Sequence, residues 1–545
     1  MRTFGALEHR AFVLIWAANA VALVGIATFD AACAWLMTSL NPDPFMVSLV
    51  QTATVLPMFL LTLMGGAIAD VVDPRRFLIV NSAFIALLVA AFAAILSAKL
   101  ATSASLLATI FVLSGAWALN APAWLALIPG LVPPEELESA IAAGGFAYNV
   151  SRLLGPSAFS IVIAVFGLSA PFWFFFGCNV VAIALLGPRR APKRSEARLP
   201  PERVVSAFRV GLRHAVHNRR LHAPLARAAA FFLFASAFSA LLPLVARHAL
   251  GLPAFYGAML SALAVGSIAG SLAFVSLRTR FGLDRVVVLG VALTSTALFL
   301  FGSSHGAVAL LAASVVAGFA GLVVLTSLYV SAQQVLPNWV RARGLAILLT
   351  VVFGSASLGS AGWGKLASAN DPSTALLLAA AGALLTIPLT WRWRLESAAG
   401  VDLHPSPHYR KMNLARKVDD DEGPILVTVD YRVRPADRAS FLEAIAEMGR
   451  ERRRNGATHW GAFEDVEEDG RFVEIFALDS WLDLHRLRER VTNADREVER
   501  RIEAMLEEER RVRFHVAPPR RPRASIVEAA TIQAVMRTLG GRRRA

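Results

Sequence analysis

The sequence predicts an all-α membrane protein with a small α+β domain after its last membrane helix. Hydrophobic residues make up 56% of the chain and charged residues 17%, which is far more apolar than a soluble protein. Long apolar runs alternate with short polar breaks over residues 11–389, whereas Arg, Glu and Asp become frequent from Asp402 onward. The chain therefore contains a membrane part and a water-exposed part.

The apolar runs have the length of membrane helices. A bilayer core about 30 Å thick requires roughly 20 apolar residues per helix. Twelve segments meet this requirement. The first six are residues 11–37, 46–69, 76–96, 104–128, 137–165 and 169–186, and the last six are 224–244, 256–277, 286–302, 307–329, 344–367 and 374–391.

The Lys and Arg residues between the spans predict the orientation, because positively charged loops stay on the cytoplasmic side. With the amino terminus inside, the outside loops carry only Lys99, Arg247 and Lys365, and the inside loops carry all the others. We therefore expect a multi-pass protein of the plasma (inner) membrane with both termini in the cytoplasm. The short polar start of the chain has no cleavage site, so we expect no removable signal peptide.

The longest basic connection divides the spans into two sets of six. The predicted parts are an amino-terminal six-helix bundle (1–187), a cytoplasmic central loop with an amphipathic helix (188–223), a carboxy-terminal six-helix bundle (224–394), a linker (395–423), a cytoplasmic domain (424–517) and a basic tail expected to be disordered (518–545). In the cytoplasmic domain we predict strands at 425–433, 457–466, 471–478 and 511–516, and helices at 435–454 and 480–509. The order strand, helix, strand, strand, helix, strand is consistent with a ferredoxin-like unit.

Several function classes are disfavoured by the sequence. A net charge of +14 would suggest nucleic-acid binding on a soluble domain, but the basic residues flank apolar spans or lie in the tail, so we expect no nucleic-acid partner. Cys33 and Cys178 both lie in apolar runs and are expected to be packing residues. Neither metal-ligand spacing nor a phosphate-binding Gly-Lys-Ser/Thr loop occurs, so we expect no metal, no cofactor and no direct use of ATP.

A Gly, Asp and Arg motif lies at the predicted cytoplasmic end of the second span, in residues 65–76. Gly66 permits close helix approach, and Asp70 can accept a hydrogen bond from a basic residue or a helix amino terminus. Together with Asp73, Arg75 and Arg76, these residues would form a latch for one conformation. The alternative is an ordinary Asp-Pro turn with basic anchors.

This motif and the six-plus-six layout resemble the major facilitator superfamily, whose halves rock about a cavity at the membrane midplane. Gly144-Gly145 followed by residues 152–156 (Arg-Leu-Leu-Gly-Pro) resembles the antiporter motif of that superfamily and favours export. A Pro-kinked packing helix is the alternative interpretation of the same residues.

The cytoplasmic domain carries the most specific similarity. Residues 452–457, 479–481 and 489–496 are similar to the tail of the transmembrane secretion effector branch, which includes enterobactin-exporter-like proteins. The resemblance implies a proton-coupled secondary active transporter that exports a small organic molecule, such as a drug or a siderophore, by alternating access. The alternatives are an importer, or a transporter fused to a monooxygenase-like enzyme domain.

Asp30 is the predicted proton-coupling residue. It lies well inside the first span, where a charge costs several kcal/mol, so an ionisable residue there is a functional candidate. We predict that Asp30 binds and releases a proton as the cavity changes access. The alternative is that Asp30 lies in water near the outer mouth and caps a kink.

A set of polar and aromatic residues inside the spans is predicted to bind the substrate. Arg152 in the fifth span could hold an anionic group, pair with Asp30, or make a purely structural bond to a helix carboxyl end. Apolar walls with a few polar contacts suit an amphipathic molecule. The other predicted substrate-binding residues are Asn19, Asn120, Trp124, Tyr148 and Asn149.

The tail resembles antibiotic-biosynthesis monooxygenase domains, which are small dimeric barrels. The candidate residues for such an activity would be His459, Trp460, Trp481, His485 and Asn493. Trp460 and Trp481 equally fit core positions of a strand and a helix. We therefore expect no enzyme activity and favour a regulatory, substrate-sensing or dimerising role for this domain.

Overall fold

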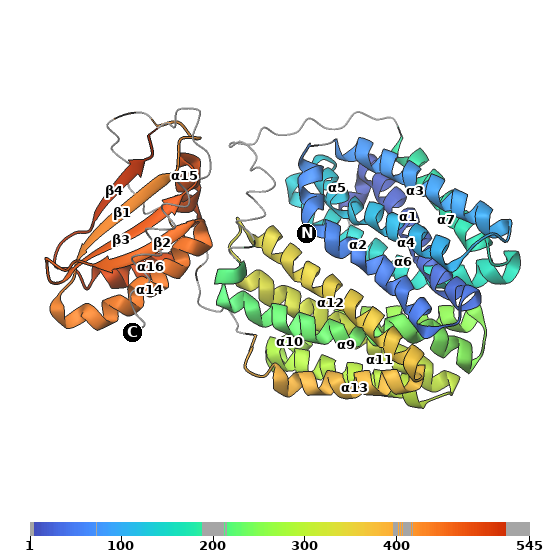
Figure 1. The fold of residues 1–545 in the computed structure, drawn as a ribbon. Coiled ribbons are helices and arrows are strands. Elements are labelled where there is room, and N and C mark those ends of the chain that lie inside the picture. The colour runs from blue at the N-terminus through green and yellow to red at the C-terminus, as the bar shows by residue number, and fades with distance from the viewer. Residues whose placement is uncertain are drawn as a thin grey trace. The chain divides into compact units, whose positions relative to one another are not determined.

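The computed structural model divides into two compact units, Met1–Gly400 and Val401–Ala545. It describes residues 5–71, 73–187, 212, 215–395, 402, 404, 406, 416 and 418–518, without the side chains of residues 62–71, 121, 122, 125, 126, 129 and 134. The predicted amphipathic helix of the central loop and the basic tail fall largely outside the described residues. Figure 1 shows the helical unit in blue to yellow and the unit with the sheet in orange to red.

The amino-terminal half of the helical unit contains long helices that follow the predicted spans. These helices are α1 (Arg10–Leu40), α2 (Pro44–Val71), α3 (Pro74–Ser97), α4 (Ser103–Ala118), α5 (Asn120–Leu127), α6 (Leu137–Phe166) and α7 (Ala170–Leu186). The predicted fourth span, 104–128, is interrupted at Leu119, whose N–H bonds to Ala116 O at 3.3 Å. Pro122 explains this break, because it has no N–H to donate to a carbonyl one turn earlier.

The carboxy-terminal half contains α9 (Arg219–Ala249), α10 (Pro253–Ser303), α11 (Ala307–Gln334), α12 (Arg341–Ala369) and α13 (Pro372–Leu389). Within α10 the backbone leaves the helical region at Gly282, where φ is 76° and ψ is 161°. Glycine adopts this conformation without a Cβ clash, so α10 consists of two helices joined at a kink. These two helices occupy the predicted spans 256–277 and 286–302.

Nine helices in the described part of the chain are long and apolar enough to cross a membrane. The kinked helix α10 counts as one of them, and α4 and α7 are apolar but shorter. A count of twelve requires that α10 crosses twice and that α4 and α7 each cross once. The membrane-protein class is confirmed, and the count of twelve remains a prediction.

The two halves of the helical unit meet where α2 packs on α12 and α6 packs on α10. We call the end of the unit at which α1 finishes, near Leu40, the far end. There Gly364 and Gly257 allow close approach, because a Cβ on either would overlap Ser48 or Ser160 across the boundary. The halves are therefore tightly closed at the far end.

Polar and aromatic contacts join the halves at the same end. Arg247 Nη1 on α9 donates to Thr38 Oγ1 at 2.7 Å and to Ser39 Oγ at 3.1 Å, both on α1. Trp35 on α1 stacks on Tyr256 of α10 with ring centroids 6.0 Å apart. Separation of the halves at this end would break all of these contacts.

The second unit contains a four-stranded sheet and three helices. Its elements are β1 (Ile425–Arg432), α14 (Arg438–Asn455), β2 (His459–Glu464), β3 (Arg471–Leu478), α15 (Trp481–Arg490), α16 (Asn493–Glu503) and β4 (Arg511–Val516). The sheet has the order β2-β3-β1-β4, and all neighbours are antiparallel. Buried residues alternate along β1 and β3, which indicates that one face of the sheet is covered (Figure 1).

The elements of this unit follow the predicted order, with one difference. The single helix predicted at 480–509 is two helices, because Val491 is extended and Thr492 caps α16. The Thr492 hydroxyl accepts from the N–H of Asp495, and the Asp495 carboxylate accepts from the N–H of Thr492. This capping box was visible in the sequence as Thr-x-x-Asp and marks a new helix start.

A network of charged groups is buried beneath the sheet. Glu474 accepts from Tyr431 Oη at 2.7 Å and from Trp460 Nε1 at 2.9 Å, and Arg452 Nη2 lies 3.2 Å from Glu499. Buried charges need such partners to offset the loss of hydration. Glu451 is also buried, but neither of its carboxyl oxygens makes a hydrogen bond within the described residues. Burial therefore raises the pKa of Glu451 well above its ordinary value.

The packing of α10 on α11 predicts a stability difference between two glycines of one helix. A Cβ on Gly318 would overlap the backbone carbonyl of Leu263, whereas a Cβ on Gly321 would meet open space. We expect Gly318→Ala to destabilise the protein by about 1 to 3 kcal/mol through overpacking. Gly321→Ala should be neutral or slightly stabilising, because alanine favours helix. Thermal unfolding in detergent measures both, and equal melting temperatures for the two variants would contradict the packing.

The buried carboxyl of Glu451 predicts a pH-dependent stability of the second unit, because it lies 3.9 Å from Arg452 Nη1 but makes no hydrogen bond within the described residues. Its folded pKa lies above the ordinary 4.5, so the folded state holds the proton longer and stability falls as pH rises above 4.5. Glu451→Gln should therefore raise the melting temperature at pH 8 and change it little at pH 4. Glu443→Gln, at an exposed position of the same helix, is the matched control. Circular dichroism of the separate Val401–Ala545 unit gives the measurement, and an equal shift at both pH values would disprove the assignment.

Candidate functional site

A central cavity of about 380 Å³ is lined by residues from both halves of the helical unit. Its walls come from α1, α2, α4, α6, α9 and α10. Asp30 on α1 and Arg152 on α6 are the charged residues in its lining. The two ionisable residues singled out from the sequence therefore lie in one cavity between the halves.

Asp30 presents its carboxyl to the central cavity, and its side chain is exposed there. Tyr256 of α10 lines the same cavity, and its ring packs on Trp35 and Phe159. Arg152 lines the same cavity, yet no direct ion pair joins it to Asp30 in the described part of the chain.

Arg152 is held by the residue one turn earlier on its own helix. Its Nη1 lies 3.5 Å from Tyr148 Oη, and its guanidinium carbon lies 5.9 Å from the centre of the Tyr148 ring. The side chain is exposed to the cavity. Tyr148 leaves several guanidinium donors available to an anionic group in the cavity, since arginine carries five N–H donors.

A close contact between α1 and α6 places Asp30 and Arg152 at this cavity. Gly155 has no room for a Cβ, which would overlap Ala27 on α1. Thr28 Oγ1 donates to the carbonyl of Gly155 at 3.1 Å, so the helices are also joined by a hydrogen bond. The Gly155-Pro156 pair of the predicted motif is therefore a helix-packing contact beside the charged residues.

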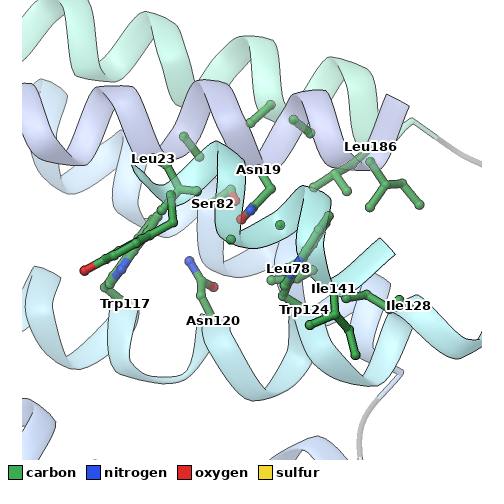
Figure 2. Close-up of a pocket in the computed structure, with 17 residues that line it drawn as sticks. Asn19, Leu23, Leu78, Ser82, Trp117, Asn120, Trp124, Ile128, Ile141 and Leu186 are labelled. Atoms are coloured by element: carbon green, nitrogen blue, oxygen red, sulfur yellow. The ribbon is translucent and has the colours of Figure 1, made fainter. Parts of the chain in front are cut away.

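A second cavity, of about 450 Å³, lies within the amino-terminal half alone. Figure 2 shows Asn19 of α1 and Asn120 of α5 facing each other, with Trp117 on one side and Trp124 on the other. The lining residues are Ile15, Ala18, Asn19, Ala22, Leu23, Leu78, Ser82, Trp117, Asn120, Trp124, Ile128, Ile141, Gly144, Gly145, Tyr148, Ala182 and Leu186. Five of the six predicted substrate-binding residues are thus divided between two cavities, and Tyr148 belongs to both.

Asn81 is a polar residue near this cavity that the sequence interpretation missed. It is buried on α3, and its Nδ2 donates to Asn120 Oδ1 at 2.7 Å and to the carbonyl of Ala116 at 2.9 Å. It therefore fixes the orientation of Asn120. The signal available in the sequence was the pair Asn81-Ser82 inside an otherwise apolar span.

Asn149 lies outside the lining of both cavities. Its Nδ2 donates to the carbonyl of Gly145 at 3.0 Å, one turn earlier on the same helix. The helical periodicity explains this, because Asn149 points about 100° away from Tyr148 around α6. Its predicted role in substrate binding remains a prediction.

The predicted latch residues lie in three different environments. Asp73 caps α3 by accepting from the N–H of Arg76 at 2.8 Å. Arg75 is buried and donates to the carbonyls of Leu186 and Gly187 at the carboxyl end of α7. The side chains of Gly66 and Asp70 lie outside the described residues, so the latch stays a prediction.

The aromatic candidates of the second unit have structural contacts. Trp460 Nε1 donates to the buried Glu474, and Trp481 is a buried core residue whose ring packs edge-on against His485. Asn493 Nδ2 donates to Asp402 Oδ2 at 2.8 Å, while His459 is exposed on β2. Four of the five candidate residues of the second unit therefore have a structural contact that explains their position without a catalytic role.

The family follows from comparison with known proteins. A family model described as transmembrane secretion effector matches residues 1–520. The chain belongs to this family of the major facilitator superfamily. It is 27% identical over 279 residues to the multidrug efflux pump Tap of Mycolicibacterium fortuitum. That match spans 48% of this chain and 66% of the relative, slightly less than two thirds of its length.

Solved transporter structures share the fold at low sequence identity. The nucleoside transporter NupG matches with a TM-score of 0.55 and 13% identity, over 70% of this chain and 98% of that one. A POT family transporter in complex with a thioalcohol-conjugated peptide matches with a TM-score of 0.57 and 11% identity, over 70% and 96% of the two chains. The protein is thus a multi-pass membrane transporter with a major facilitator fold.

The position of Tyr148 in both cavities predicts its chemical accessibility. In a variant with Cys33 and Cys178 replaced by alanine, Tyr148→Cys should react quickly with a small water-soluble thiol reagent. The adjacent Ala147→Cys should react slowly, because position 147 is buried against neighbouring helices. Labelling followed by mass spectrometry gives both rates. Equal rates at the two positions would mean that Tyr148 does not face an open cavity.

Proposed function

We propose that this transporter is a proton-coupled exporter of a small organic molecule and works by alternating access. The proposal rests on one observation: a cavity between the two halves contains one carboxylate, Asp30, and one guanidinium, Arg152. Family membership supports secondary transport, and the name of the relative, a multidrug efflux pump, favours export. Drug-like and siderophore-like molecules are the proposed cargo.

The proposed topology has twelve spans, with α10 crossing twice, and both termini in the cytoplasm of a plasma membrane. The loops at the amino-terminal end of α1 carry most of the basic residues, which supports this orientation. The contacts of Arg247, Gly257 and Gly364 then close the outer side of the transporter. The described conformation would accordingly have its closed end outside the cell.

The proposed cycle couples a proton to the movement of the halves. With Asp30 ionised, its charge and that of Arg152 attract each other across the cavity. Protonation of Asp30 removes this attraction and frees Arg152 to interact with an anionic group of the cargo. Because both residues line a cavity between the halves, this change in charge acts where the halves must separate.

We retain the latch with fewer residues than the sequence predicted. Asp70 and Gly66 would stabilise the closed state at the amino-terminal end of the unit, whereas Asp73 and Arg75 have local structural contacts that hold α3 and α7 in place. Arg76 is exposed and could serve as a basic anchor. Asn19, Asn120, Trp124 and Tyr148 are retained as proposed substrate contacts.

We also propose that the second unit is a ferredoxin-like cytoplasmic domain with a sensing or dimerising role. Its element order and the sheet order β2-β3-β1-β4 support this classification. The structural contacts of Trp460, Trp481 and Asn493 favour a binding role over a monooxygenase activity.

Substitution of Asp30 by asparagine tests the proposed coupling. We expect Asp30→Asn to abolish dye accumulation in inverted membrane vesicles driven by an imposed pH gradient, because asparagine cannot exchange a proton. Ethidium and the uncharged dye Nile red are suitable probes. Asp43→Asn, in the connection between α1 and α2, makes the same charge change outside the cavity and should transport normally. Undiminished pH-driven transport by Asp30→Asn would remove Asp30 from the mechanism.

A further inference from the structure

The cavity within the amino-terminal half differs chemically from the central cavity. Among the described side chains its lining contains no charged residue, whereas the central cavity contains Asp30 and Arg152. Its volume of about 450 Å³ falls in the range of small-molecule sites in proteins. This cavity would stabilise a charged ligand poorly, because its apolar walls offer no counter-ion and cannot replace the water that hydrates the charge.

The polar groups that face this cavity are incompletely satisfied. Asn120 Oδ1 accepts from Asn81, but Asn120 Nδ2 has no partner among the described residues. The side-chain amide of Asn19, directly opposite, likewise makes no hydrogen bond within the described part of the chain (Figure 2). Unpaired amides in an apolar environment cost free energy, so a hydrogen-bonding ligand or water would stabilise them.

Two tryptophans form flat walls on opposite sides of this cavity. Trp117 and Trp124 lie on opposite sides of the facing amides (Figure 2), and both are only half-buried. Indole rings provide large flat apolar surfaces that pack well against other rings. The combination of flat apolar walls and two central amides suits a planar ligand with one or two polar atoms.

We propose that the cavity within the amino-terminal half is a binding site for an uncharged, planar, largely apolar molecule, separate from the central cavity. The molecule packs between Trp117 and Trp124 and hydrogen-bonds to Asn19 and Asn120. Leu23, Trp117 and Tyr148 line both cavities, so a bound molecule has a short route to Asp30 and Arg152. As a statement about cargo class, this inference rests on the proposed transport function.

Gly145 makes the site testable. It lines the cavity, and a Cβ added at this position would meet no atom within 4 Å. A leucine there would occupy cavity volume with little strain on the fold. Gly177 on α7 also has open space around its Cβ and lies outside the lining, so Gly177→Leu is the matched control.

The experiment measures binding of N-phenyl-1-naphthylamine, an uncharged planar probe with one N–H group, to the full chain in lipid nanodiscs. Saturable quenching of tryptophan fluorescence reports the binding, and empty nanodiscs correct for partition of the probe into lipid. We expect Gly145→Leu to weaken binding by about ten-fold or more, since one misplaced alkyl group has that effect in an apolar pocket. Gly177→Leu should bind as the unmodified protein does. Asn120→Asp should also weaken binding, because it places a charge in the uncharged cavity.

The outcomes separate this inference from the proposed transport. Binding that is lost in Gly145→Leu but kept in Gly177→Leu supports the second site, whatever Asp30→Asn does to pH-driven transport. Absence of saturable binding to the unmodified protein would mean that the cavity holds only water. Equal affinity for Gly145→Leu and the unmodified protein would place the probe elsewhere, and either result overturns the inference.

Discussion

The close approach of α1 to α6 is the contact on which the central cavity depends. Gly155 has no Cβ, and this absence lets Ala27 and Thr28 lie directly against the backbone of α6. Asp30 follows Thr28 by half a helical turn, and Arg152 precedes Gly155 by nearly one turn. The same packing contact therefore brings an acid and a base from different helices to one cavity.

The arrangement of charge in the membrane part follows from the cost of placing ions in hydrocarbon. Asp30 and Arg152 share a cavity, and ionisable residues inside membrane helices are usually found at such cavities because a charge facing hydrocarbon is costly. The polar side chains that line the second cavity in the described part of the chain are amides, hydroxyls and indoles among apolar residues, so this cavity can lie inside one half without a counter-ion. Two chemically different chambers thus adjoin each other and share Tyr148 as a common wall.

In the second unit, buried charged residues are compensated by direct contacts with one another. Glu474, Arg452 and Glu499 are almost completely buried there, and direct ion pairs and hydrogen bonds compensate their desolvation. Glu451 is the exception, because it makes no hydrogen bond within the described residues and its burial raises its pKa well above the ordinary value. In the helical unit a buried charge likewise has partners, since Arg75 donates to the carbonyls of Leu186 and Gly187 and Arg227 lies 2.9 Å from Asp284.

The sequence alone determined the membrane class and the places of most helices, because each span must supply enough apolar residues in series to cross hydrocarbon. Thus α6 (Leu137–Phe166) lies where residues 137–165 were predicted, and the capping box at Thr492 marked a helix start that the prediction passed over. The helix break at Leu119, near Pro122, was not predicted, because hydropathy averaged over a whole span does not detect a local break in an apolar run.

Only the tertiary structure decided which polar residues share a cavity. Asn19, Asn120 and Trp124 line the cavity within the amino-terminal half, and Asp30 and Arg152 line the central cavity. Asn149 lines neither cavity. Asn81 was missed because its role depends on its distance to Asn120, which lies on a different helix. Hydropathy is a property of residues in series along one helix. A site is set by the angles and close contacts between helices, which depend on side chains far apart in the sequence.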